Sequence, residues 1–167
     1  AGLPDEMRRT AQESFLSGAI RVLAATSAFG MGVDKPDIRL IVHHALCGSV
    51  EEYYQEIGRA GRDGEAASCL LLWSWQDVMI RRHFIAQSES GEKTEAVRRG
   101  EERRLGRMIQ YAQTGQCRRG FILDHFAGRH VRYRCGECDN CRARGDQAAN
   151  VAAPTAARYA DPGRGAA

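Results

Sequence analysis

Short apolar runs alternate with helical patterns along the first half of the chain. Three such runs, bounded by glycine or polar residues, cover residues 20–26, 38–42 and 68–73. Continuous apolar runs of this length are typical of strands buried on both faces of a parallel sheet. Apolar residues at helical spacing mark residues 3–18 and 75–86, and Ser49 with Glu52 three residues later is a capping box that begins another helix. This alternation predicts an α/β fold with a covered parallel sheet.

The second half of the chain is helical and ends without periodicity. The polar stretch at residues 87–94 predicts a linker. Residues 95–113 place apolar side chains on one face and arginines on the other, and residues 118–126 predict a shorter helix. The end of the chain is rich in Ala, Pro, Gly and Arg and cannot bury enough apolar surface to offset its ordering entropy. We therefore expect an α/β lobe over residues 1–86, the linker, a helical domain over residues 95–145 and a disordered tail over residues 146–167.

The composition of the chain predicts an intracellular location and a basic surface. The chain has 167 residues, enough for one ordinary domain or two small ones. No apolar run approaches the roughly 20 residues that span a bilayer, and no signal peptide is visible, so we expect an intracellular protein without membrane contact. The chain does not begin with Met, which suggests a piece of something longer. Net charge is only +3, but residues 98–134 carry ten arginines against three acidic residues, a local charge of +7. Such a segment indicates a nucleic-acid surface, or a solvated basic face.

A glycine frame holds two arginines at the end of the predicted helix that begins near Ser49. The segment Gly-Arg-Ala-Gly-Arg-Asp-Gly spans residues 58–64. Glycine lets the backbone approach another surface or adopt a positive φ, and the arginine fork matches phosphate oxygens. The alternatives are a phosphate-binding loop and a polar turn. The loop at residues 26–34 follows the first strand, where ligands of α/β sheets bind, and the two loops can face one site if their strands are neighbours.

Four of the six cysteines have metal-ligand spacing. They follow a C-x17-C-x2-C-x2-C pattern: Cys117, Cys135, Cys138 and Cys141. Four thiolates form the closed tetrahedral site of structural zinc. Disulfides and an iron–sulfur cluster are the alternatives, although a proline usually follows the ferredoxin-type run and Arg142 stands here instead. Cys47 and Cys69 are isolated, and we expect both to be small buried hydrophobes.

The five histidines carry no separate prediction of chemistry. His125 and His130 lie between the metal-spaced cysteines and are expected not to be ligands, because four cysteines suffice. His43 and His44 end the second predicted strand. Both could line a cleft, and ordinary packing at the strand end is the favoured interpretation.

Two stretches and the cysteine pattern together resemble one family. Residues 25–36, Ala-Thr-Ser-Ala-Phe-Gly-Met-Gly-Val-Asp-Lys-Pro, resemble motif V of the RecQ-type helicases of superfamily 2, and residues 53–64 resemble their motif VI. The cysteine pattern is similar to the RecQ zinc-binding subdomain. The resemblance covers roughly residues 1–142.

The resemblance implies ATP-driven 3′-to-5′ unwinding of DNA, in repair or recombination, by two RecA-like lobes with ATP and Mg²⁺ between them. The chain is similar to the latter part of the second lobe followed by the zinc subdomain. It contains no G-x-x-x-x-G-K-[ST] phosphate loop, so we expect it to be inactive without the first lobe. Partners would be ATP and single-stranded or junction DNA, in the cytoplasm or nucleoid of a bacterium or in a eukaryotic nucleus. A non-catalytic zinc-containing DNA-binding or interaction module, and a translocase that does not unwind, are the alternatives.

The same resemblance suggests roles for individual residues at the ATP site. Arg62 would be the arginine finger, Arg59 a second contact to the γ-phosphate or between lobes, and Gln55 a nucleotide sensor. Asp34 would contact the ribose or bridge to Arg59. Two glycines would complete the nucleotide contacts, Gly32 and Gly58.

Further residues would contact DNA or metal. Motif V would hold DNA phosphates through Thr26 and Gly30, contacts that position a strand without reading its sequence. The zinc subdomain would add Arg118 and Arg119. Zn²⁺ on the four cysteines would be structural.

Overall fold

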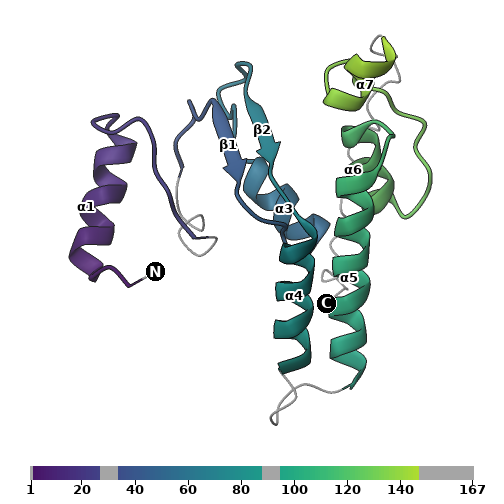
Figure 1. The fold of residues 1–167 in the computed structure, drawn as a ribbon. Helices are drawn as coiled ribbons and strands as arrows, with labels where there is room; N and C mark the ends of the chain where they lie inside the picture. The colour runs from purple at the N-terminus through teal and green to yellow at the C-terminus, as the bar shows by residue number, and fades with distance from the viewer. Residues whose placement is uncertain (1, 27–33, 88–94, 147–167) are drawn as a thin grey trace, which may run out of the picture. The chain divides into compact units, whose positions relative to one another are not determined.

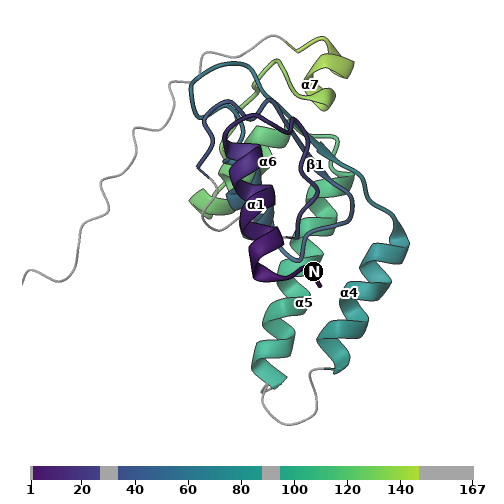
Figure 2. The same ribbon diagram turned by 90° about the vertical axis from the view of Figure 1, so that its left-hand side faces the viewer.

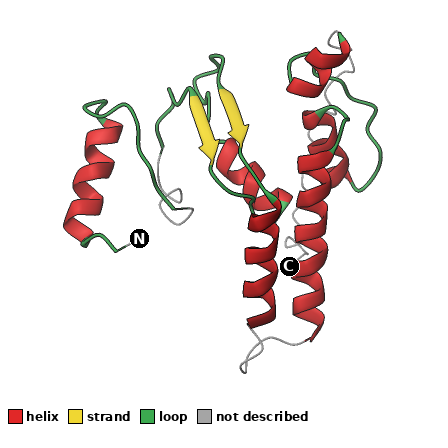
Figure 3. Cartoon of the chain, in the orientation of Figure 1, coloured by secondary structure: helices red, strands yellow, loops and turns green. Residues whose placement is uncertain are grey.

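Two short strands pair in parallel, and a helix connects them (Figures 1 and 3). The computed structural model describes residues 2–26, 34–87 and 95–146. Its elements, in chain order, are α1 (Asp5–Leu16), β1 (Leu40–His43), α3 (Val50–Ile57), β2 (Ser68–Leu71), α4 (Trp75–Gln87), α5 (Glu95–Gln113), α6 (Arg118–Ala127) and α7 (Asp139–Arg144). Leu40 lies opposite Ser68, and His43 lies opposite Leu71. The parallel pair with its crossover helix confirms the predicted α/β class.

The predicted strand at residues 20–26 is wrong. These residues follow an irregular path, and Val22 is 85% exposed. A strand requires a hydrogen-bonded neighbour, and no described segment pairs with this one. The expectation that the sheet is covered on both faces is also wrong for the described residues: Leu40 and Val42 are exposed, whereas Ile41 and His43, on the opposite face, are half-buried.

The capping box at the start of α3 forms as predicted, with one difference. Ser49 Oγ accepts a hydrogen bond of 3.1 Å from the amide of Glu52. The Glu52 carboxylate reaches back one residue further than usual and accepts from the amide of Gly48 at 2.7 Å. The helix buries Val50 and Tyr53.

The predicted helices α4 and α5 lie side by side, as both ribbon views show (Figures 1 and 2). Residue Tyr111 of α5 meets Tyr53 of α3, with ring centroids 5.2 Å apart. The apolar face predicted for α5 is confirmed, because Leu105 and Met108 are fully buried and Ile109 is buried. No helix in the described ranges is long and apolar enough to cross a membrane.

The first predicted helix is confirmed as α1, but its apolar face is not buried. Pro4 precedes it at the N-cap position, and no residue of the helix is buried. Met7, on the face expected to pack, is 55% exposed. Contact with the following segment comes from Lys35, whose Nζ donates to the carbonyl of Leu16 at 3.4 Å and lies 5.8 Å from the ring centroid of Phe15.

The chain divides into two compact units, Ala1–Thr114 and Gly115–Ala167. Helix α5 belongs to the first because it contacts α3 and α4. The second contains α6, predicted from the sequence, and α7, which was not. The predicted linker at residues 87–94 and the predicted tail lie almost wholly outside the described residues, so the four-part division stays a prediction.

Candidate functional site

The arginine turn, residues 58–64, is shaped by its glycines. Gly58 ends α3, and its amide donates to the carbonyl of Tyr54 at 3.0 Å. Gly61 has φ +62°, and a Cβ at that position would lie 2.6 Å from the carbonyl oxygen of Glu65. Any other residue at Gly61 would therefore strain the backbone and collide with it. The glycine frame is a requirement of this turn.

Backbone and side-chain bonds tie the arginine turn to the residues before β1. The amide of Gly61 donates to the carbonyl of Ile38 at 3.0 Å, and the amide of Asp63 donates to that of Pro36 at 3.4 Å. Both terminal nitrogens of the Arg39 guanidinium donate to the Asp63 carboxylate, and the Nη1–Oδ1 distance is 3.0 Å. The hydrogen bond from Arg39 lowers the pKa of Asp63 below its ordinary value. The turn thus lies at the amino-terminal ends of both strands, held by a charged pair that sequence reasoning missed.

Arg62 points to the end of the motif V segment. Its Nη1 lies 2.6 Å from Asp34 Oδ1, and its Nε donates to the carbonyl of Gly58 at 3.4 Å. The Arg62 side chain is 40% exposed and that of Asp34 is 82% exposed. The two predicted loops therefore meet through the Arg62–Asp34 pair, and the suggested bridge from Asp34 to Arg59 stays a prediction. Gly30 and Gly32 lie outside the described residues.

Three further residues predicted for the ATP and DNA sites lie in the first unit. Gln55 is exposed on α3, and Arg59 is half-buried one residue after the helix cap. Thr26 is exposed in the irregular segment that was predicted to be a strand. Their positions leave the assigned roles as predictions.

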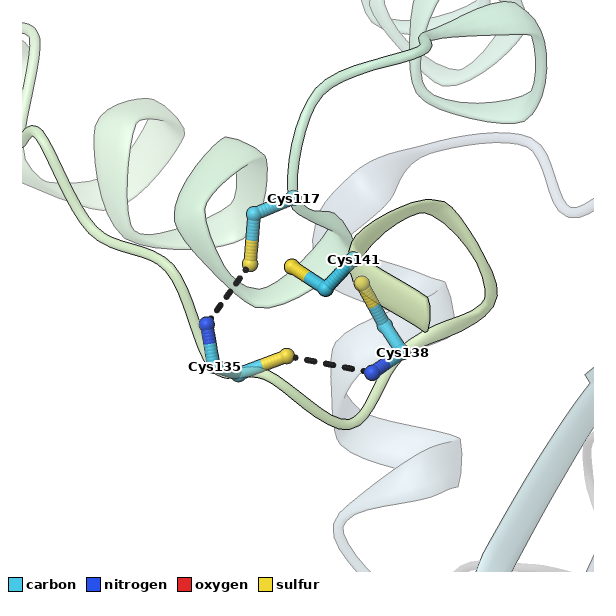
Figure 4. Close-up of side chains that lie close together, drawn as sticks. All are labelled: Cys117, Cys135, Cys138 and Cys141. Carbon is cyan, nitrogen blue, oxygen red and sulfur yellow. Dashed lines mark hydrogen bonds between the residues drawn. The ribbon is translucent and has the colours of Figure 1, made fainter. Parts of the chain in front are cut away.

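The second unit brings together the four metal-spaced cysteines (Figure 4). Their sulfurs all lie within 4.8 Å of one another, and their side chains point toward a common centre. Cys117 and Cys138 occupy the N-cap positions of α6 and α7, Cys141 lies within α7, and Cys135 is in the loop between the helices. Three of the four residues are buried. This donor set fits one Zn²⁺ in a closed site.

Backbone amides surround these sulfurs. Amides of Gly120 and Cys135 donate to Cys117 Sγ at 3.4 and 3.3 Å, and the amide of Arg118 donates to Cys138 Sγ at 3.4 Å. Burial raises the pKa of the Cys117 thiol to about 12. Burial also opposes ionisation of Cys138, but the Arg118 amide and the neighbouring cysteines outweigh it and lower its pKa to about 7. Amide donors of this kind stabilise thiolates and orient them toward a cation.

The two arginines predicted to bind DNA are paired within the second unit. Arg118 Nε and Nη2 donate to the Asp139 carboxylate at 3.0 and 2.8 Å. Arg119 lies 3.1 Å from Glu137 and keeps 59% of its side chain exposed. The first pair joins the start of α6 to the start of α7, which the sequence did not reveal.

The structure also places the two isolated cysteines and two of the histidines. Cys47 is buried as predicted. Cys69 is exposed, so that prediction is wrong: β2 is exposed at three of its four residues. His130 bonds to Asp124 at 2.7 Å, and its expected exclusion from the metal ligands stays a prediction. His43 Nε2 lies 2.6 Å from the Glu56 carboxylate.

Comparison with known proteins finds one family model for each half of the chain. Residues 1–64 match the helicase conserved C-terminal domain, and residues 75–142 match the RecQ zinc-binding domain. The chain is 46% identical over 140 residues to the ATP-dependent DNA helicase RecQ of Bacillus subtilis, which covers 84% of this chain and 23% of that protein. It is 39% identical over 146 residues to the RecQ-like DNA helicase blm-1 of Caenorhabditis elegans, covering 84% and 14%. The bifunctional 3′-5′ exonuclease/ATP-dependent helicase WRN of Mus musculus is 37% identical over 153 residues, covering 86% and 10%. The chain thus spans about a quarter or less of the relatives it matches.

Proposed function

Because the chain belongs to the RecQ family, we propose that it forms the second half of an ATP site and a zinc-stabilised DNA-binding module in an ATP-dependent 3′-to-5′ DNA helicase. The observation that supports this most is the arginine turn, whose Arg62 is exposed and held beside Asp34. The role is that of the later part of the second lobe, with the phosphate loop and magnesium ligands supplied from outside this chain. Such an enzyme would act on chromosomal DNA, in the nucleoid or the nucleus, during repair or recombination.

Arg62 is the proposed arginine finger. Phosphoryl transfer requires the protein mainly to position the nucleotide and to neutralise developing charge, and a finger contributes about 10³–10⁵ in rate in related enzymes. The pair with Asp34 joins two exposed side chains, and exposed pairs contribute only about 0–1 kcal/mol. A γ-phosphate can therefore replace Asp34 as the partner of Arg62 at little cost.

The other nucleotide contacts remain proposals around this finger. Arg59 would contact the γ-phosphate or the facing lobe, and Gln55 would sense the nucleotide from the exposed side of α3. Asp34, released from Arg62, would be available for the ribose. The backbone at Gly58 and Gly32 would complete the contacts.

Zinc would be structural and would be held by the four clustered cysteines. It would supply a fixed tetrahedral crosslink between the starts of α6 and α7 and the loop that carries Cys135. The Arg118–Asp139 pair and the hydrogen bond from Asn140 Nδ2 to the Gln116 carbonyl at 2.7 Å close the same junction. A unit this small gains its stability largely from such crosslinks.

DNA binding would involve the exposed arginines of α5 together with Arg119. Arg103 and Arg104 are exposed on α5, opposite its buried face. Arginines that neutralise phosphates release counterions, and this makes affinity depend steeply on salt. Thr26 and Gly30 would hold DNA phosphates, and Arg118 would orient the zinc-bound loop from its place beside Asp139.

The decisive experiment replaces Arg62 in the full-length protein that contains this chain. Arg62→Ala should lower the DNA-stimulated rate of ATP hydrolysis by about 10³ or more while nucleotide affinity stays nearly unchanged. Arg9→Ala, on the exposed surface of α1, is the matched control. Retained turnover in Arg62→Ala would remove the finger assignment.

A further inference from the structure

A second set of metal donors lies in the first unit, at the opposite ends of the strands from the arginine turn. One ring nitrogen of His43, the Cys47 sulfur and one carboxylate oxygen of Glu56 all lie within 4.8 Å of one another. His43 is the last residue of β1, Cys47 lies in the loop before α3, and Glu56 lies in the last turn of α3. Three separate parts of the backbone thus converge on one point.

Distances within this cluster are close to those that a tetrahedral ion requires. The Cys47 Sγ–Glu56 Oε2 distance is 3.8 Å and the His43 Nε2–Glu56 Oε2 distance is 2.6 Å. With metal–ligand bonds of about 2.0–2.3 Å, tetrahedral ligands lie roughly 3.3–3.6 Å apart. The sulfur and the carboxylate are already near that spacing. The imidazole and the carboxylate need to separate by about 0.7 Å, which rotation of the Glu56 side chain can provide.

The imidazole of His43 has binding capacity that its present contacts do not use. Its side chain is 9% exposed, and Nε2 bonds to Glu56. Its Nδ1 is buried and has no hydrogen-bond partner within the described part of the chain. A buried polar atom left without a partner costs about 1–3 kcal/mol. The ring of Tyr53, 4.9 Å from that of His43, shields one side of the cluster.

The surrounding charges favour a cation. Glu52 lies next to the cluster through its bond to the amide of Gly48, one residue after Cys47. Arg81 is the opposing charge, and its Nε is engaged by the carbonyl of Leu46 at 3.1 Å. Two carboxylates therefore face one guanidinium around a buried thiol, an environment suited to a divalent ion.

We propose that His43, Cys47 and Glu56 form a second metal site, which takes a divalent ion of the zinc class with three protein ligands and one open position. Nitrogen, sulfur and oxygen donors together suit Zn²⁺ or Co²⁺. They do not suit Mg²⁺ or Ca²⁺, which prefer oxygen ligands only. The thiol proton passes to the buffer as the sulfur binds the ion. The site is independent of the four-cysteine cluster and of the proposed ATPase role. An ion there would fix the end of β1 to the last turn of α3, two residues before Gly58.

The test measures metal binding by the 167-residue chain as given. Protein loaded with one equivalent of Zn²⁺, which the four-cysteine cluster takes first, is titrated with Co²⁺. We expect a second ion to bind with a near-ultraviolet charge-transfer band about one quarter as intense as that of cobalt on four thiolates, because this site supplies one thiolate. Cys47→Ala should remove this band and leave the first zinc in place. Cys69→Ala, which removes the exposed cysteine, is the matched control and should leave both ions bound.

Several outcomes overturn the proposal. A wild-type chain that binds one ion only, or a band lost in Cys69→Ala and kept in Cys47→Ala, excludes the site. If Cys47→Ala does not fold, as judged by protease sensitivity of α4 and α5 in the first unit, Glu56→Gln provides the same test and should weaken the second ion by at least about tenfold. Unchanged affinity of the second ion in Glu56→Gln also refutes the site.

Discussion

Gly120 is the residue where one added methyl group tests the zinc unit most directly. It lies in the first turn of α6, and a Cβ built there would be 2.7 Å from the carbonyl oxygen of Tyr133. Its amide donates to Cys117 Sγ, and Tyr133 stands two residues before Cys135. Gly120→Ala must therefore push apart two segments that each carry one of the four clustered cysteines.

The expected loss follows from two opposing effects. Overpacking a tightly fitted contact costs about 1–3 kcal/mol. Replacing glycine by alanine in a helix returns up to about 1 kcal/mol. After subtraction of about 1 kcal/mol, the second unit is destabilised by up to about 2 kcal/mol, which corresponds to a change of up to about 30-fold in an equilibrium constant. Gly106, within α5, has no atom within 4 Å of such a Cβ, so Gly106→Ala should stabilise the chain by about 0.5–1 kcal/mol.

Two measurements separate the variants. Competition with a chromophoric chelator should show weaker zinc retention in Gly120→Ala and wild-type retention in Gly106→Ala. Urea unfolding should move the midpoint down for the first and up for the second. If Gly120→Ala keeps wild-type zinc affinity and stability, the close approach between α6 and the Tyr133 backbone is refuted.

Three further predictions concern the metal, the arginine turn and the basic helix. Chelation of zinc should make residues 115–146 sensitive to protease and leave α4 and α5 resistant, because structural zinc contributes on the order of 10 kcal/mol to small domains; equal sensitivity of both units would contradict this. The pKa of Asp63 is lowered in the folded chain by Arg39, so this pair adds stability above the ordinary carboxylate pKa of about 4 and loses it as pH falls through the depressed value. Thermal unfolding between neutral and acidic pH should thus show a smaller acid loss in Asp63→Asn than in wild type, and identical profiles would count against the pair. In fluorescence anisotropy with labelled single-stranded DNA, Arg103→Ala with Arg104→Ala should weaken binding and reduce the salt slope by about one for each phosphate that is no longer neutralised, whereas Arg8→Ala with Arg9→Ala on α1 should change neither.

Much of the fold could be predicted where the local pattern is long. Helices α4 and α5 and the buried face of α5 follow from apolar periodicity over several turns, and the start of α3 follows from Ser49 and Glu52. The cysteine cluster follows from spacing alone. The run at residues 20–26 has the composition of a strand, but the sequence does not encode whether a neighbour is present to pair with it. Helix α7 was missed because six residues are too few to show periodicity.

Contacts between residues that are distant in the sequence could not be predicted. Arg39 and Asp63 stand 24 residues apart, and Arg62 and Asp34 stand 28 apart, so no local pattern joins them. The family resemblance brought the two loops together, but the Asp34–Arg62 pair was not among the contacts it suggested. Cys47 and Cys69 have similar apolar neighbours in the sequence, and only the position of β2 at an exposed surface distinguishes them.

The length of α3 has a consequence for which insertions this lobe can accept. Its eight residues, about 12 Å of helix, connect the Ser49 cap to Gly58. One added or deleted residue would rotate everything beyond it by about 100° and shift it by about 1.5 Å. Glu56 would then swing away from His43 while Arg62 left the side of Asp34. A single-residue insertion in α3 should therefore break both the Glu56–His43 contact and the Arg62–Asp34 contact. The number of residues between the Ser49 cap and the arginine turn is thus fixed by the two contacts together.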